Sequence, residues 1–479
     1  MNNTSASQIT LFQALLPVGF LVVFLATNVF IYGDGALGGA HQFVLLMCAA
    51  IAGIIGSRLE LSYQSMLDAV AHNIQSITTA LLILLFVGSL AGTWLLSGII
   101  PAMIYYGLQI IHPNVFLPAC VILCAVVSVM TGSSWSTTAT IGIALIGIGK
   151  VLGIPVGMVA GAVISGAYFG DKLSPLSDTT NLAPAMAGTN LFVHIRYMTY
   201  TTVPTIVMTL VVFSIISMTQ SVSGTTDVNA LLTDIEGHFN ISLWLFLVPA
   251  TLIMLIVKKT PPLVALLIGT LLGALCAIIY QPNLVLEVSG ASQFTLTSAY
   301  QGVINAMTTD IRIQTNNALL NDLFTSGGMQ GMLGTIWLVI CAMVFGGVMD
   351  AIGALQRISR WLLTMARTQF QLIASAVASC ITVNITVSDQ YLAILLPGKI
   401  YRQPFNDQQL APENLSRTLE DAGTVTSALV PWNTCGAYHS GVLGVGVGEY
   451  FIYAIFNWLS PIITLAYAFL NIKIRQLIK

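Results

Sequence analysis

Charge is what this sequence lacks most. Its 479 residues include 16 Lys and Arg and 18 Asp and Glu, or 7% of the chain, against about 25% in an ordinary soluble domain. A soluble protein of this size needs many more charges to cover its surface. Hydrophobic residues make up 56%, so the composition excludes the water-soluble classes and indicates a polytopic membrane protein.

Several motifs of other protein classes are missing too. The nearest approach to a phosphate-binding Walker A loop, ALIGIGKV at 144–151, ends in Val where Ser or Thr is required. No HExxH, GxSxG or TVGYG motif occurs, and the seven cysteines form no CxxC pair. We therefore expect no enzyme and no cofactor. The net charge of −2 provides no basic footprint for nucleic acid.

Long apolar runs fill the rest of the chain. A spanning helix needs about 20 apolar residues, and clear candidates cover 11–32, 38–57, 75–96, 115–132, 137–168, 197–217, 241–257, 261–280, 333–352, 371–395 and 449–472. The run 137–168 is either one span or two short segments joined around Lys150–Pro155. Weaker stretches at 98–111, 172–190, 313–332 and 421–445 are interrupted by polar residues, Gly or Pro. We expect an all-α membrane protein with about eleven to thirteen transmembrane segments.

Basic residues orient the chain in the bilayer. The loop after the first span holds Asp34 and no base, whereas the loop after the second begins at Arg58, and the tail carries Lys473, Arg475 and Lys479. Because bases favour the cytoplasmic side, we expect the N-terminus and the C-terminal tail in the cytoplasm. The polar stretch 218–240 holds three acids and no Lys or Arg, which suits an outer joint between two halves.

The two halves of the chain resemble one another weakly. Segment 88–110 is similar to 346–366, 131–139 takes the place of 383–391, and 168–181 takes the place of 418–433. Repeats with broken helices in corresponding positions mark the binding sites of secondary transporters. We expect N-terminal helices over 1–74, a first repeat over 75–217, a linker with scaffold helices and a hairpin over 218–332, and a second repeat over 333–479. Broken segments are predicted near 131–140, 168–190, 383–391 and 417–436.

The densest polar group at membrane depth lies in 168–190. Asp171, Ser174, Asp178 and Asn181 are spaced three, four and three residues apart, which is one face of a helix. Pro175 favours a broken backbone instead. Either geometry gathers oxygen atoms in one place, and hard cations prefer oxygen ligands.

Asp178 and Asp171 differ in their neighbours. Asp178 has no base nearby in sequence, so its carboxylate can hold either a proton or a sodium ion, and competition for one carboxylate is enough for antiport. The alternative is that Asp178 only caps a re-entrant helix. Asp171 precedes Lys172, and the alternative there is a structural ion pair with that lysine or another base.

Three further segments supply polar groups. Within stretch 131–140, residues 133–140 hold six hydroxyls, including Ser134 and Ser136, which either join helices or line an unwound segment. The second half repeats the theme with Asn384, Ser388 and Asp389, and stretch 417–434 adds Glu420, Asp421, Thr426 and Asn433. Arg417 has a plausible structural role as a partner of Glu420 or Asp421.

Several long motifs resemble one known family. TGSSWSTTATIGIAL, GAYFGDKLSPLSDTTNLAP, VSDQYLAILLPGKIY and LSRTLEDAGTVTSALVPWNTCGAY are similar to the sodium/proton antiporter NhaC family, which includes malate/lactate antiporters. The resemblance implies a carrier of the bacterial inner membrane from the ion transporter superfamily. It further implies inverted repeats, two re-entrant hairpins, elevator-type motion and a homodimer.

These observations predict a Na⁺/H⁺ antiporter that works by alternating access. Asp178 is the expected shared carboxylate and, with Asp389, the expected direct sodium ligand. The remaining expected ion or substrate ligands are Ser177, Thr179, Asn181, Asp171, Ser134, Ser136, Ser388, Asn384, Thr426 and Asn433. The alternative is a carrier of malate, lactate or an amino acid on the same sodium site, with Trp135, Tyr391 and Trp432 shaping its pocket. A channel or an intramembrane enzyme is the alternative from a different class.

Overall fold

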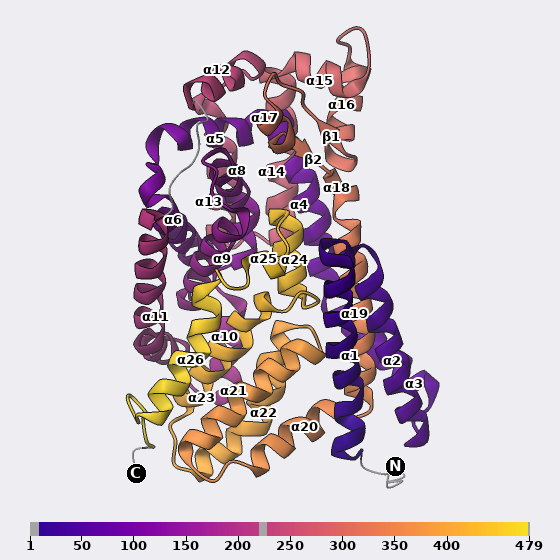
Figure 1. Cartoon of the computed structure of the whole chain (residues 1–479), viewed down its shortest axis with the longest axis vertical. Helices are drawn as coiled ribbons and strands as arrows, with labels where there is room; N and C mark the ends of the chain where they lie inside the picture. The colour runs from indigo at the N-terminus through magenta and orange to yellow at the C-terminus, as the bar shows by residue number, and fades with distance from the viewer. Residues whose placement is uncertain (1–8, 220–227, 478–479) are drawn as a thin grey trace.

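The computed structural model describes residues 9–219 and 228–477, which are almost entirely helical (Figure 1). Residues 1–8, 220–227 and 478–479 lie outside the described part. Part of the predicted outer joint at 218–240 therefore falls outside it. The first half comprises α1 (Leu11–Tyr32), η1 (Gly33–Gly38), α2 (Ala40–Arg58), α3 (Tyr63–Ser76), α4 (Thr78–Leu96), α5 (Ile99–Ile110), η2 (Pro113–Val115), α6 (Phe116–Thr131), α7 (Ser134–Thr137), η3 (Thr138–Gly142), α8 (Ile143–Val151), α9 (Val156–Leu173), α10 (Asp178–Ala187) and α11 (Leu191–Thr219).

The middle segment and the second half continue the helical pattern. The middle holds α12 (Val228–His238), η4 (Leu243–Phe246), α13 (Leu247–Val257), α14 (Pro262–Tyr280), α15 (Pro282–Ser289), α16 (Leu296–Thr308), β1 (Ile311–Arg312), α17 (Ala318–Leu323), β2 (Thr325–Ser326) and α18 (Gly328–Gly331). The second half holds α19 (Leu333–Ala351), α20 (Ala354–Thr364), α21 (Gln369–Thr386), α22 (Gln390–Asp407), α23 (Pro412–Leu419), η5 (Glu420–Thr424), η6 (Val425–Leu429), α24 (Thr434–Leu443), α25 (Val447–Tyr450) and α26 (Ile455–Phe469). Strands β1 and β2 form one short antiparallel pair.

Eight of the described helices are long and apolar enough to cross a membrane, and a bent pair made of α12 with η4 and α13 brings the number to nine. This is fewer than the eleven to thirteen segments expected. The reason is that several apolar runs are divided into shorter helices, such as α5 with 12 residues and α26 with 15. The run 137–168 follows the two-segment alternative, because the chain turns between α8 and α9 at Leu152–Pro155.

Each half contains two helices that stop and restart. In the first half α6 ends at Thr131, before Gly132, whose φ of 69° only glycine adopts easily, and α9 ends before Ser174–Ser177. In the second half α21 ends before 387–389 and η6 ends before 430–433. Each restart has its own cap, since Ser133, Ser177, Asp389 and Asn433 accept a backbone N–H from α7, α10, α22 and α24 respectively.

The two halves interlock at these restarts. Helix α10 of the first half packs against α22 and α23 of the second, and α24 of the second packs against η3 and α7 of the first. Figure 1 shows α10 and α24 between the lower block of α20–α23 and the upper block of α4, α5 and α8. The order of helix, break and helix therefore recurs in both halves, while the domain boundaries at 74, 217 and 332 stay a prediction.

Helices α6 and α9 of the first half pack closely against each other. A Cβ added at Gly166 would lie 2.2 Å from the Val121 carbonyl oxygen, and one at Gly170 would lie 2.4 Å from that of Ala125. Small residues allow membrane helices to approach this closely. The rigid pair carries both first-half breaks at adjacent ends.

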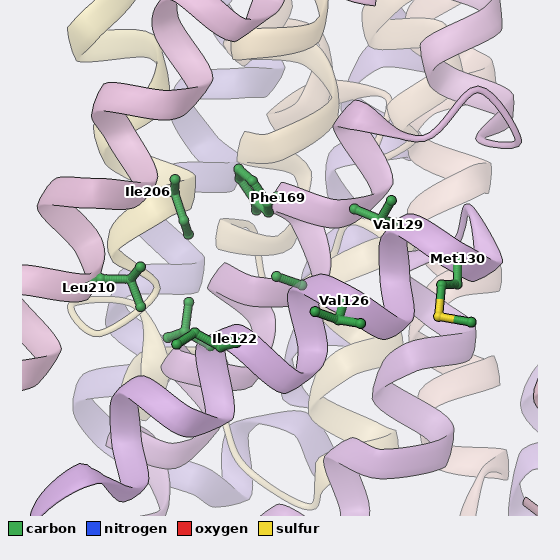
Figure 2. A pocket seen from close by; sticks show the side chains of 9 residues that line it. Ile122, Val126, Val129, Met130, Phe169, Ile206 and Leu210 are labelled. Atoms are coloured by element: carbon green, nitrogen blue, oxygen red, sulfur yellow. The ribbon is translucent and has the colours of Figure 1, made fainter.

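The outer surface beside this pair holds an apolar groove of about 380 Å³. Figure 2 shows its walls, which come from α6, α9 and α11 and include Ile122, Val126, Phe169, Ile206 and Leu210. Every lining side chain is apolar. The groove therefore offers no ligand to an ion, and the polar chemistry lies elsewhere.

Candidate functional site

The broken segments of both halves line one cavity of about 680 Å³. The first half contributes residues at the α6–α7 and α9–α10 breaks, and the second half contributes the start of α22 and of α24. The expected ligands that line it are Ser134, Ser136, Asp171, Ser177, Asp178, Thr179, Asn181 and Asp389. Residues far apart in sequence thus meet at one polar surface.

Asp171 is held by the first break. Its side chain is buried, and Oδ2 accepts hydrogen bonds from the backbone N–H and the hydroxyl of Ser134, at 3.1 and 2.7 Å. Ser134 is the first residue of α7, where free backbone N–H groups are available. The alternative of an ion pair between Asp171 and Lys172 or another base is wrong for the described residues, because Lys172 pairs with Asp421 and no other base pairs with Asp171.

Lys172 belongs to a different ion pair. Its ammonium group contacts the Asp421 carboxylate, and both side chains are fully buried. Lys172 also donates to Ser460 Oγ at 3.1 Å, and Thr201 donates to Asp421 at 2.9 Å. This network joins α9, η5, α11 and α26 behind the cavity.

Arg417 takes no part in that network. The sequence suggested Glu420 or Asp421 as its partner, but its guanidinium lies over the Tyr197 ring, 4.6 Å from the centroid. One of its nitrogens donates to the Lys473 carbonyl at 3.4 Å. Helical spacing misleads here because α23 turns Arg417 toward α11 and the C-terminal tail.

Asp178 occupies the first turn of α10 and faces the cavity. Ser177 provides the cap by accepting the Thr180 N–H at 3.4 Å, so the cap role considered for Asp178 belongs to Ser177. The Asp178 side chain is exposed rather than buried in protein. Among the described residues no hydrogen bond or ion pair involves its carboxylate. The negative charge is stabilised by its position at the N-terminus of α10.

Asn181 lies one turn after Asp178. Its amide nitrogen donates to the carbonyls of Pro175 and Ser177, at 3.0 and 2.6 Å. Both bonds use the NH₂ group, so Oδ1 is left as a free acceptor. This places a neutral oxygen beside the cavity together with the Asp178 carboxylate.

Asp389 is the counterpart from the second half. It is buried and caps α22 by accepting the Leu392 N–H at 3.0 Å, and the part of the chain that the structure describes places no base against it. Ser388 before it has a φ of 65°, and its carbonyl accepts the Thr434 N–H at 2.8 Å. The strained turn joins the starts of α22 and α24.

Three expected ligands lie behind the wall instead of on it. Asn384 donates to Thr426 Oγ1 at 3.0 Å and accepts from Asn433 Nδ2 at 3.1 Å. These residues are buried and, like Ser388, do not line the cavity. In this conformation they brace the second-half breaks and do not face the cavity.

Glu420 is a carboxylate that the list of expected ligands omits. It is fully buried, accepts from Thr179 at 2.9 Å and Thr424 at 2.8 Å, and forms no ion pair in the described chain. It begins η5, a π-helical turn, and such turns are frequent at functional sites. The acidic pair Glu420–Asp421 can be seen in the sequence. Only the fold shows that Asp421 pairs with a lysine, whereas Glu420 pairs with no described base.

Aromatic residues complete the cavity wall. Trp135 stacks on Tyr438 with ring centroids 3.9 Å apart, and Tyr391 lines the wall beside Asp389. Trp432 does not line it, because its indole nitrogen donates to the Ile385 carbonyl at 2.7 Å. The charged groups on the wall are Asp171, Asp178, Asp389 and Lys259.

No cluster of three His, Cys, Asp or Glu close enough to hold one metal ion occurs in residues 9–219 and 228–477. A sodium ion at this wall would therefore rely on one or two carboxylates and on neutral hydroxyl, amide and carbonyl oxygens.

Comparison with known proteins settles the family. A family model described as the Na⁺/H⁺ antiporter family matches residues 166–472. This chain belongs to the Na⁺/H⁺ antiporter family. The predicted membership in the NhaC-type group is confirmed, because NhaC of Alkalihalophilus pseudofirmus is 36% identical over 96% of both chains. The residues that the family model matches include Asp171, Asp178 and Asp389, whereas Ser134 precedes them.

Other relatives in the family carry different names. A malate-2H⁺/Na⁺-lactate antiporter of Bacillus subtilis is 36% identical, covering 94% of this chain and 92% of its own. An arginine/ornithine antiporter, ArcD, of Halobacterium salinarum is 32% identical, covering 96% of this chain and 92% of its own. The names of these relatives are those of antiporters for different solutes.

Proposed function

We propose that this protein exchanges Na⁺ for H⁺ and that Asp178 is the carboxylate both ions share. The observation that carries the proposal is the cavity, which gathers carboxylates and hydroxyls from the breaks of both halves around Asp178, whose side chain has no hydrogen bond or ion pair with a described residue. A lone carboxylate neutralised by either ion supports exchange, since one ion must leave before the other binds. Family membership supports the same function.

The neighbouring residues supply the oxygen ligands that sodium needs. Asp178 provides the charge, Asn181 Oδ1 and the hydroxyls of Ser177 and Thr179 provide neutral oxygens from the same break, and Ser136 faces them from α7. Asp171 and Asp389 lie on the same wall. We assign their carboxylates a secondary role in sodium binding. The cap at Ser177 fixes the start of α10 and so holds Asp178 and Asn181 on one turn.

We propose that the protein works by alternating access, which the interlocking of the halves supports. Because α10 packs on α22 and α23 while α24 packs on α7 and η3, a movement of these elements carries the broken segments of both halves together, past the wall residues of α4 and of the turn between α13 and α14. We place the protein in a bacterial inner membrane as a homodimer with both termini in the cytoplasm, as the resemblance and the basic tail suggest.

A coupled organic solute is the second candidate. The cavity of about 680 Å³ is far larger than the roughly 30 Å³ that a water molecule occupies in the liquid, and the malate/lactate and arginine/ornithine antiporters are relatives. Na⁺-driven exchange that appears only with malate, lactate or an amino acid present would favour it.

Proton movement in proteoliposomes tests the proposal. With a pH gradient imposed, Na⁺ alone should dissipate the gradient in the unaltered protein and fail to do so in Asp178→Asn. The matched control is Asp407→Asn, which changes an exposed aspartate that accepts a hydrogen bond from Gln403 and lies outside the cavity. A folded Asp178→Asn protein that still exchanges Na⁺ for H⁺ would overturn the assignment.

A further inference from the structure

One base lies on the cavity wall, and it comes from outside the broken segments. Lys259 lines the cavity from the turn between α13 and α14, next to Thr260. The other charged residues on the wall are Asp171, Asp178 and Asp389, which lie at the breaks. A single positive charge therefore shares the cavity with three carboxylates.

The fold makes no use of the Lys259 ammonium group. This residue is exposed, and no described residue forms a hydrogen bond or an ion pair with its side chain. Lys172 differs, because it is buried and its charge is neutralised by Asp421. Since no described carboxylate pairs with Lys259, its positive charge acts on what the cavity contains.

The backbone of the turn fixes where Lys259 starts. Helix α13 ends in a Schellman motif, in which the Lys259 N–H donates to the Ile256 carbonyl at 2.8 Å. In the same motif the Thr260 N–H donates to the Leu255 carbonyl at 3.0 Å. Lys259 has a φ of 62°, a conformation in which glycine is usual. The prolines at 261–262 follow at once and also line the cavity, so the turn holds this position at its edge.

A positive charge on the wall opposes the binding of Na⁺. Two like charges repel with an energy that rises as the dielectric constant falls, and dissolved salt screens the repulsion. This repulsion needs no contact between Lys259 and the ion. If the broken segments move past the α13–α14 turn as proposed above, Lys259 shares a cavity with the carboxylates in only one of two conformations.

We propose that Lys259 weakens Na⁺ binding at the cavity carboxylates in this conformation, and that the effect is lost when the broken segments move away from the α13–α14 turn. The inference rests on the proposed function, because it requires alternating access. Sodium is then released more easily to the side on which the carboxylates face Lys259 than to the other side. Lys259 sets the affinity for Na⁺ without being one of its ligands.

Equilibrium binding of ²²Na⁺ to the purified full-length protein is the first test. At about pH 8.5 lysine stays charged and protons compete weakly for carboxylates. Lys259→Gln should lower the Kd for Na⁺ by about 2- to 15-fold, the range for removing one nearby charge between the dielectric of water and that of a protein surface. Lys259→Arg keeps the charge and should keep the Kd within about twofold of the unaltered protein. Raising choline chloride from about 0.1 to 1 M shortens the screening length from about 10 to 3 Å, and should reduce the effect of Lys259→Gln.

Lys258→Gln is the matched control. Lys258 is the neighbouring base, is exposed in the same turn and does not line the cavity, so its loss should leave the Kd for Na⁺ unchanged. Glutamine is suited to position 259, since Gln409 already has a φ of 59° at the corresponding place after α22.

Sodium exchange across a membrane tests the restriction to one conformation. Proteoliposomes with a single orientation of the protein exchange ²²Na⁺ for Na⁺, and the half-saturating Na⁺ concentration is measured on each face. Lys259→Gln should lower this concentration on one face and leave it unchanged on the other.

The outcomes separate this inference from the antiport proposal, because neither test requires proton movement. An unchanged Na⁺ affinity in Lys259→Gln, the same gain in Lys258→Gln, or an equal shift on both faces would overturn the role of Lys259 and leave antiport standing. The predicted one-sided shift, in a protein whose proton movement ignores Na⁺, would support the inference and remove the antiport proposal. A folded protein that binds no Na⁺ would overturn both.

Discussion

At the scale of single residues, the surroundings of each carboxylate decide what it can do. Asp421 is matched by Lys172, Asp171 is held by Ser134, and Asp389 caps α22. Asp178 alone among the cavity's aspartates has no partner in the described chain and faces the open cavity. A group without a partner is the one free to exchange ligands, which is why the proposal rests on it.

Glu420 provides a prediction at this scale. Glu420→Ala should lower the melting temperature in detergent, because the Thr179 and Thr424 hydroxyls lose their acceptor, at about 1–3 kcal/mol for each unpaired group. Glu420→Gln should lose much less, since its amide oxygen can still accept. Equal melting temperatures for the Ala and Gln variants would contradict this role.

At the scale of elements, the sequence predicts the breaks better than their partners. Pro175, Gly132 and the cap residues mark where helices stop, and these are local signals. Lys172 and its partner Asp421 lie 249 residues apart in the chain, so the sequence alone does not show that they pair. For the same reason the sequence does not show that three expected ligands lie behind the cavity wall, namely Asn384, Thr426 and Asn433.

The tight contact of α6 with α9 gives a prediction for an element. Gly170→Ala should lower thermal stability by about 1–3 kcal/mol, because the new methyl group lies 2.4 Å from the Ala125 carbonyl and forces the helices apart. Gly448→Ala is the control, with no atom within 4 Å of the added Cβ. A Gly170→Ala protein as stable as the control would show that this packing is not needed.

At the scale of the whole molecule, a buried ion pair and an aromatic stack link the halves around the cavity. The pair of Lys172 with Asp421 joins α9 of the first half to η5 of the second, and Trp135 of α7 stacks on Tyr438 of α24. Both halves have the same order of helix, break and helix along the chain. The cavity therefore has wall residues from both halves, together with residues of α4 and of the turn between α13 and α14.

The ion pair between the halves gives a prediction for the whole fold. Lys172→Met and Asp421→Leu should each lower the yield of folded protein, because an unpaired buried charge costs about 3–5 kcal/mol. The double variant removes both charges and should recover part of that loss. Size-exclusion profiles of the three variants in detergent check this, and a double variant worse than either single one would speak against a pairwise link.

The most direct measurement of the central claim is proton release on sodium binding. Purified protein in weakly buffered detergent solution receives Na⁺ while pH and bound Na⁺ are both followed. If Asp178 is shared, the unaltered protein should release protons in proportion to the Na⁺ it binds, and Asp178→Asn should neither bind Na⁺ nor release protons. Sodium binding without proton release, or full release from Asp178→Asn, would contradict the account.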